Sequence, residues 1–312
     1  MSGRSLSRPG QAVPAARPPL PPIPQDRVDR PLAAFARDYP DGHDTGWHNH
    51  ARAQLLYATA GVMRVSTGAA GFVVPPGRAL WVPAGLPHAV SMRNGGVAMR
   101  ALFVRRDAAE AAGGPPAAAV LAVSPLLREL ILAACSEPLE WDPAGRGGRI
   151  AALILDEIAS ARPLPLGVPA PRDPRLLRLA DALRADPSRP LTLEGWAAEC
   201  GASPRTLTRL FRRETGMSFG RWRQMLRLSE AAALLAQGVP ATRAAVLVGY
   251  ASVPAFGSAF RAAFGHTPGA GSVRLGASHA GPGPAPQEDT PNMTISRLSD
   301  RCIGINKLTK ER

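Results

Sequence analysis

Cysteine and lysine are scarce in this chain of 312 residues. The three cysteines, Cys135, Cys200 and Cys302, are odd in number, widely spaced and without a C-x-x-C pair, which excludes a disulfide framework. We therefore expect a reducing cytoplasm and thiols that are buried or incidental. Lysine occurs only at Lys307 and Lys310, so arginine carries nearly all of the positive charge. Because a GC-rich genome produces the same bias, the net charge of +13 is alone a weak indication of a polyanionic partner.

Long apolar runs are missing as well. No stretch approaches the 18 uninterrupted apolar residues that a membrane-spanning helix needs, so we expect no membrane association. Residues 1–25 are rich in Pro and Arg and lack the apolar centre of a signal peptide, which predicts a disordered arm. Residues 273–312 are expected to form a disordered tail.

A pattern typical of helix–turn–helix units occurs twice in the last third of the chain. Ser203–Arg212 and Ser252–Arg261 each open with a Ser that can cap a helix, and each continues with the apolar i, i+3, i+4 spacing of a half-buried helix. A short apolar helix precedes each segment and ends at Gly201 or Gly249, where Gly supplies the left-handed residue of a sharp turn. The apolar stripe over residues 218–237 predicts one long helix that joins the two units.

The polar faces of these segments predict contacts with double-stranded DNA. The first segment offers an arginine-rich face with a hydroxyl, which suits base edges and phosphates, and the second offers few base-reading groups. Exposed arginines are also common on solvated helices. However, residues 172–274 hold 15 Arg against 7 acidic residues, the surplus that a polyanion-binding domain needs. We expect Arg205, Thr208 and Arg209 to read bases and Arg212 and Arg261 to hold phosphates. Ser258 completes the set of candidate DNA-binding residues.

Together these features resemble the AraC/XylS family of bacterial transcription regulators over about residues 174–269. The marks of the resemblance are L-T-L-E at Leu191–Glu194, S-P-R-T-L-x-R-L-F at Ser203–Phe211, G-Y-x-S with F-x-x-A-F-R at Gly249–Arg261, and F-G-x-T-P at Phe264–Pro268. The resemblance implies two helix–turn–helix units that place recognition helices in successive major-groove segments, with RNA polymerase as a further candidate partner. Leu247 stands where the family tends to carry a polar or acidic residue.

Strand-like segments separated by turn residues fill residues 32–104 and indicate an antiparallel barrel or sandwich. Two spaced motifs, G-x5-H-N-H-x3-Q-x6-G from Gly42 to Gly61 and G-x5-P-x-G-x2-H from Gly77 to His88, resemble the paired motifs of the cupin family. That resemblance implies a small jelly-roll barrel. Gln54 stands where the family usually has Glu.

A candidate effector or metal site follows from the first motif. His48, His50 and Gln54 are separated by even numbers of residues, so on an extended strand they project to one face, and His88 can join them from a second strand. Three imidazoles and a carbonyl oxygen can hold a divalent transition metal, although a neutral Gln compensates the charge of the ion less than a carboxylate would. The sequence leaves three roles open: a metal site, a metal-free pocket for a small-molecule effector, and a purely structural cluster. The nearby Trp47, Tyr57, Met63 and Trp81 fit either the lining of a pocket or ordinary core.

Two helical patterns follow the strands, at Val120–Ala134 and Gly148–Ala159. They predict a segment that packs on the barrel and presents a helix for homodimer formation, although core packing alone explains them equally well. We divide the chain into an arm (1–25), a cupin-like sensor barrel (26–110), a helical packing or dimerisation segment (111–161), a proline-rich linker (162–173), a double helix–turn–helix domain (174–272) and a tail (273–312).

The predicted fold class is α+β with several domains, in which an N-terminal antiparallel β-barrel of the cupin or jelly-roll type precedes an all-α double helix–turn–helix domain. We expect a sequence-specific DNA-binding transcription regulator, not an enzyme, whose barrel senses a small molecule or a metal and modulates DNA binding. The alternative is a metal-dependent, dioxygenase-like cupin enzyme that carries a DNA-binding module. Such an enzyme needs a carboxylate ligand or another base that the histidine motif does not obviously supply.

Overall fold

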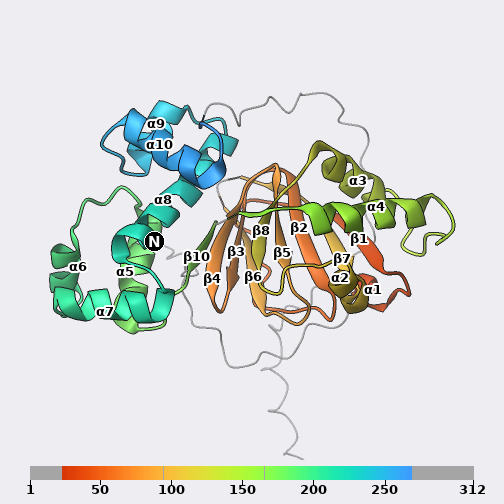
Figure 1. Ribbon diagram of the computed structural model, residues 1–312, viewed down its shortest axis with the longest axis horizontal. Helices are drawn as coiled ribbons and strands as arrows, with labels where there is room; N and C mark the ends of the chain where they lie inside the picture. The colour runs from red at the N-terminus through yellow and green to blue at the C-terminus, as the bar shows by residue number, and fades with distance from the viewer. Residues whose placement is uncertain (1–22, 94, 165, 269–312) are drawn as a thin grey trace, which may run out of the picture. The chain divides into compact units, whose positions relative to one another are not determined.

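The computed structural model describes residues 23–268, except 94 and 165 (Figure 1). The strands of this part are β1 (Leu32–Tyr39), β2 (Ala53–Ala60), β3 (Met63–Thr67), β4 (Ala70–Val74), β5 (Arg78–Val82), β6 (His88–Met92), β7 (Val97–Val104), β8 (Ala119–Ala122), β9 (Pro163–Leu164) and β10 (Gly167–Pro169). The helices are α1 (Pro24–Arg27), α2 (Arg106–Ala111), α3 (Pro125–Cys135), α4 (Arg146–Ser160), α5 (Pro174–Ala185), α6 (Leu193–Glu199), α7 (Pro204–Thr215), α8 (Phe219–Ala236), α9 (Ala241–Leu247) and α10 (Val253–Phe264). The predicted tail, Cys302 and most of the predicted arm lie outside the described residues.

The strands form two antiparallel sheets that share one core. The larger sheet has the order β1-β7-β2-β5-β8-β9, and the smaller has the order β10-β4-β3-β6. Leu56 of β2 and Met63 of β3 both belong to the core between the sheets, whereas Leu55 and Tyr57 belong to a second core on the helix side of the larger sheet. Because side chains alternate along a strand, Gln54 has the same orientation as Leu56. The prediction of an antiparallel β domain followed by helices is confirmed.

Helices α3 and α4 cover the outer face of the larger sheet (Figure 1). Leu127 and Ile131 of α3 and Ile154 of α4 are fully buried in this second core. Trp81 and Tyr57 lie in the same core, so they face the helices and not the space between the sheets. The helical pattern predicted from Val120 is wrong at its start. Residues 119–122 pair with β5 as a strand, and the helix begins only after the capping residue Ser124.

The proline-rich segment 162–173 is extended, as its composition indicates, and it also takes part in both sheets. Pro163–Leu164 pairs with β8, and Gly167–Pro169 pairs with β4. Helix α1 begins at Pro24, so the last two residues of the arm predicted for 1–25 lie in this helix, and Gln25 is already buried. The proline-rich segment, whose composition suggests a solvent-exposed linker, is therefore held by backbone hydrogen bonds at the edges of both sheets.

The helices from α5 to α10 build two small cores that α8 connects. Trp196, Leu207 and Phe211 lie in the core of α5, α6 and α7, and Phe256 and Phe260 lie in the core of α9 and α10. Helix α8 contributes its first half to the former and its second half to the latter, as the apolar stripe over residues 218–237 predicts. No helix in the described part of the chain is long and apolar enough to cross a membrane.

Candidate functional site

Helices α7 and α10 are built on the same plan. The hydroxyl of Ser203 accepts a hydrogen bond from the Thr206 N–H and caps α7, and the hydroxyl of Ser252 does the same for α10 through the Ala255 N–H. Each helix has 12 residues and ends at a glycine in the left-handed region, with φ of 71° at Gly216 and 78° at the end of α10. The repeated sequence pattern is thus a repeated structure.

In the described part of the chain, three of the four arginines of α7 have free side chains, whereas Arg213 pairs with Glu214. The side chains of Arg205, Arg209 and Arg212 are exposed, and among the described residues their guanidinium groups have no hydrogen bond or ion pair. Thr208 is exposed too, but its hydroxyl donates to the Pro204 carbonyl oxygen at 2.9 Å, so only its lone pairs are left to meet a donor. Guanidinium groups without acidic partners on one helix face can meet phosphates and base edges without first breaking an ion pair.

The second recognition helix offers less polar chemistry. Ser258 and Arg261 are exposed on α10, opposite the buried Phe256 and Phe260. Leu247 at the end of α9 is 38% exposed, at a position where the sequence already departs from the family pattern. The structure thus brings the six predicted DNA-binding residues to the surfaces of α7 and α10, and the larger share of charge lies on α7.

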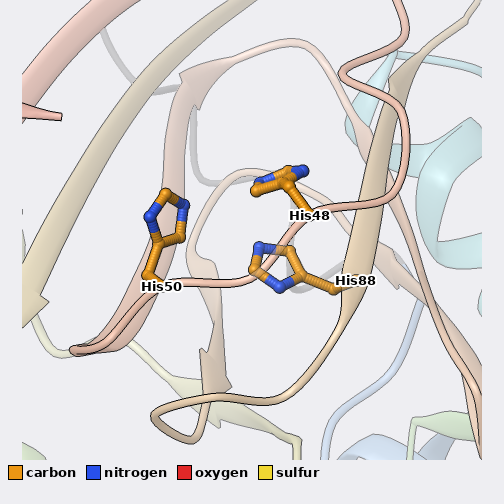
Figure 2. A group of neighbouring side chains, drawn as sticks. All are labelled: His48, His50 and His88. Atoms are coloured by element: carbon orange, nitrogen blue, oxygen red, sulfur yellow. The ribbon is translucent and has the colours of Figure 1, made fainter. Parts of the chain in front are cut away.

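The sensor domain gathers three histidines in one place (Figure 2). One ring nitrogen from each of His48, His50 and His88 lies within 4.8 Å of those of the other two. The rings of His48 and His88 are 4.4 Å apart between centroids, and His50 lies beside them. His88 begins β6, and the segment before β2 supplies His48 and His50, with His48 bridged to His88 by backbone hydrogen bonds of 2.8 and 2.9 Å. The predicted convergence is present, although His48 and His50 precede the strand that carries Gln54.

The Nδ1 atom of each ring faces an oxygen acceptor. That of His48 is 2.9 Å from the Gly46 carbonyl oxygen, that of His88 is 3.0 Å from the Leu86 carbonyl oxygen, and that of His50 is 3.3 Å from Oδ2 of Asp26. A neutral ring whose Nδ1 donates to this oxygen keeps the lone pair of Nε2, and that tautomer can bind a metal ion through Nε2. Outer hydrogen bonds of this kind orient histidines that bind metals.

Gln54 lies directly against this cluster. Its Oε1 is 3.0 Å from Nε2 of His88, and both side chains are buried. If Nε2 of His88 carries the proton, it donates to Gln54. If Nδ1 carries the proton and donates to Leu86, two acceptor atoms face each other across this contact. Either the Gln54 amide is turned so that its NH2 group donates, or the oxygen and the nitrogen direct their lone pairs at a shared cation.

Burial favours the neutral forms of His48 and His88. It lowers the pKa of His88 to about 3, with a further lowering from neighbouring His48. Burial also lowers the pKa of His48, partly offset by its hydrogen bond to the Gly46 carbonyl. A neutral imidazole is the form that coordinates a metal ion.

Asp26 supplies a negative charge that the motif analysis missed. It belongs to α1, and its side chain is only 9% exposed, as is that of His50. Its second oxygen, Oδ1, is buried without a hydrogen-bond partner among the described residues. Nothing in the sequence marks Asp26 except that it is a carboxylate shortly before the first strand. Gln54 lacks the carboxylate that the cupin motif usually has, but Asp26 supplies one next to His50. Together the three histidines, Gln54 and Asp26 fit a divalent cation.

Comparison with known proteins supports both halves of this description. Residues 32–157 match the family described as an AraC-like ligand binding domain, and residues 196–271 match a helix-turn-helix domain. The chain is 30% identical over 228 residues to the HTH-type transcriptional regulator NimR of Escherichia coli strain K12, which covers 73% of this chain and 82% of NimR. It is 41% identical over 101 residues to the HTH-type transcriptional regulator RipA of Corynebacterium glutamicum, which covers 32% of this chain and 30% of RipA.

One similar solved structure covers about a third of the chain. The C-terminal domain of AraT, a response regulator from Geobacillus stearothermophilus, is 29% identical and covers 35% of this chain and 96% of that domain, with a TM-score of 0.32. The curated relatives are transcriptional regulators, and the family matches cover the sensor and the DNA-binding halves. The chain therefore belongs to the AraC family of transcriptional regulators, with an AraC-like ligand-binding domain followed by a helix-turn-helix DNA-binding domain.

Proposed function

We propose that His48, His50 and His88 form the effector site of this regulator and that its effector is a divalent transition-metal ion. The observation that carries the proposal is the convergence of three ring nitrogens, one from each histidine, within 4.8 Å, while each Nδ1 faces an oxygen acceptor that can orient its ring. The buried Asp26 supports it, because a carboxylate near three imidazole ligands offsets part of the charge of the ion. Gln54 would then contribute its amide oxygen.

We further propose that occupancy of this site changes DNA binding by α7 and α10. Arg205, Thr208 and Arg209 would read bases, and Arg212 and Arg261 would hold phosphates, with Ser258 beside them. Their exposure and the lack of acidic partners for these arginines within the described residues support these roles. The proposed setting is the cytoplasm, where RNA polymerase is the partner that a promoter-bound regulator would meet.

The effector proposal is tested with the purified full chain after treatment with a chelator. Zn²⁺ and Co²⁺ are titrated in turn by calorimetry, and the visible spectrum of the Co²⁺ sample reports on the ligand set. His50→Gln removes one ligand at the edge of the cluster. His43→Gln is the matched control, because His43 lies close by in sequence but its ring packs on Tyr39, 4.7 Å away between centroids. Binding to DNA from upstream of the gene is then measured with and without metal.

We expect stoichiometric binding in the wild type and in His43→Gln, a loss of at least tenfold in His50→Gln, and a metal-dependent change in DNA affinity. Absence of stoichiometric binding in the wild type would overturn the proposal. Binding of an organic compound that persists in His50→Gln without any metal would favour a metal-free effector pocket instead. Stoichiometric iron with oxygen uptake would favour the dioxygenase-like enzyme, for which no further feature of the site argues.

Self-association of the sensor domain is a separate proposal. Leu126 of α3 and Leu153 of α4 are 51% and 46% exposed, whereas their neighbours Leu127 and Ile154 are buried. We propose that these exposed leucines contact a second copy of the chain. Analytical ultracentrifugation of Leu126→Glu/Leu153→Glu should give a monomer under conditions in which the wild type is a dimer. A monomeric wild type would contradict the proposal.

A further inference from the structure

A hollow of about 170 Å³ lies on α8, between the two helix–turn–helix units, and is lined by Gly220, Arg223, Gln224, Arg227 and Tyr250. Arg223 and Arg227 are one helical turn apart on α8, so their side chains share one face of the helix. The residues expected from the sequence to contact DNA do not include any of these five.

The two arginines bind backbone carbonyl groups in the segments that lead into the two helix–turn–helix units. Nη1 of Arg223 donates to the Leu191 carbonyl oxygen at 3.1 Å, immediately before Thr192, which caps α6. Arg227 donates from Nε to the Pro187 carbonyl oxygen at 2.8 Å and from Nη1 to the Gly249 carbonyl oxygen at 2.8 Å. The hollow is therefore bounded by the segment that enters the first unit and by the turn that precedes α10.

The positive charge of the hollow lacks a matching negative charge. Within the part of the chain that the structure describes, neither arginine forms an ion pair with a carboxylate, and their hydrogen bonds go to backbone carbonyls. Burial lowers the pKa of Arg227, and so does the nearby Arg223. Asp186 is the acidic group that acts on Arg227, but its Oδ1 already accepts from the N–H and hydroxyl of Ser188 at 3.0 and 2.5 Å.

Two further features suit an anion. The hydroxyl of Tyr250 is buried without a well-formed hydrogen bond, with Gln224 beside it, so a donor is available at the wall of the hollow. At Gly220 an added Cβ would meet no atom within 4 Å, which leaves one side open to a bulky group. Two fixed guanidinium groups, a hydroxyl and an amide around an open space are the donor set of a phosphate site.

We infer that this hollow binds a phosphate group of the DNA backbone at the seam between the two helix–turn–helix units. The inference rests on the proposed DNA contacts of α7 and α10. A phosphodiester held there touches α8 and, through the fixed arginines, the segments that lead into α6 and α10. Arg227 positions these segments through its three carbonyl contacts, and Arg223, which donates to one carbonyl, keeps more N–H groups for the phosphate. Binding of one phosphate would thus fix the separation of the two recognition helices on duplex DNA.

The test measures DNA affinity of the full chain by fluorescence anisotropy over a series of salt concentrations, with a footprinted upstream fragment and with random duplex. Arg223→Gln removes the charge, and Gly220→Asp adds a carboxylate at the open side. Gly220→Asp is chosen because an acidic residue in the first turn of α8 favours the helix, so lost binding is not lost folding. Arg221→Gln is the matched control, because Arg221 is exposed, lies on the same helix and does not line the hollow.

We expect Arg223→Gln and Gly220→Asp to weaken binding roughly tenfold on both duplexes. The slope of log affinity against log salt should fall by about one in Arg223→Gln, as for the loss of one phosphate contact. Both variants behaving like Arg221→Gln would overturn the site. A thermal shift with millimolar inorganic phosphate that disappears in Arg223→Gln, with DNA binding unchanged, would assign the site to a free phosphate and overturn the DNA source. A wild type that binds neither duplex would instead refute the proposed DNA contacts.

Discussion

Arg64 on β3 and Glu230 on α8, 166 residues apart in sequence, form a two-pronged ion pair with N–O distances of 2.5 and 2.6 Å. The side chains are only 30% and 11% exposed, and Val62, Val73 and Ala233 form a small buried cluster of their own. Strand β3 pairs with β6 along its length, so that Thr67 lies opposite His88. One ion pair thus links the helix shared by both DNA-binding units to the strand next to the histidine cluster.

Removing the charge of either Arg64 or Glu230 should destabilise the protein. Arg64→Gln and Glu230→Gln are each expected to cost about 1–3 kcal/mol of unfolding free energy, because each leaves a charge partly buried without its partner. The double variant should cost clearly less than the sum of the two. Chemical denaturation of all four proteins measures the coupling energy.

The same cycle on Arg100 and Asp38 is the control. That pair is 3.0 Å long, but Asp38 is 75% exposed, so its coupling should be no more than about 1 kcal/mol. Equal coupling energies in the two cycles would show that the ion pair between β3 and α8 stabilises the protein no more than an exposed pair does.

Arg209 and Arg212 should differ in what they contribute to DNA binding. Both are exposed on α7. Arg209→Ala is expected to cost about 1–3 kcal/mol of discrimination between the operator and random duplex, because Arg209 is proposed to contact a base. Arg212→Ala should weaken binding to both duplexes by similar factors. Anisotropy titrations on both duplexes measure the difference, and uniform loss in Arg209→Ala would make Arg209 a backbone contact.

The DNA-binding half was predictable from sequence because its determinants are local. Capping serines, turn glycines and apolar spacing act within one or two helical turns, and these set α7 and α10. The strands of the sensor half were only partly predictable. The expected segments between Leu32 and Val104 are strands. The pattern from Val120 predicts a helix where β8 forms, because a short apolar run has no period of its own.

The histidine site shows the same limit. The spacing of His48, His50 and Gln54 predicted their convergence with His88, and the structure brings all four together. Asp26 was not predictable, because it reaches His50 through the tertiary placement of α1 and not through any motif. The role of the cluster stays a prediction until metal binding is measured.

Cys135 should be nearly inert in the native protein. Burial raises the pKa of its thiol to about 11, and the thiol donates to the Phe35 carbonyl oxygen at 3.8 Å. At pH 8 the thiolate fraction is then on the order of 10⁻³, against roughly a quarter for an ordinary thiol. Alkylation, located by peptide mass spectrometry, should rise about tenfold per pH unit between pH 8 and 10 in the native state. In denaturant it should level off above about pH 8.5, and equal native and denatured rates would contradict the burial.

The two turn glycines of the repeated units should respond unequally to alanine. Gly201 and Gly249 have φ of 62° and 79°, so an alanine costs about 1–2 kcal/mol at either turn. At Gly201 an added Cβ meets nothing within 4 Å, but at Gly249 it would lie 2.7 Å from Cα of Ser188 and 2.6 Å from Nη2 of Arg227. Because the Ser188 backbone cannot move aside cheaply, Gly249→Ala should cost about 1–3 kcal/mol more than Gly201→Ala. Denaturation of the two variants measures this difference, and equal losses would mean that the seam between the units can open to admit a methyl group.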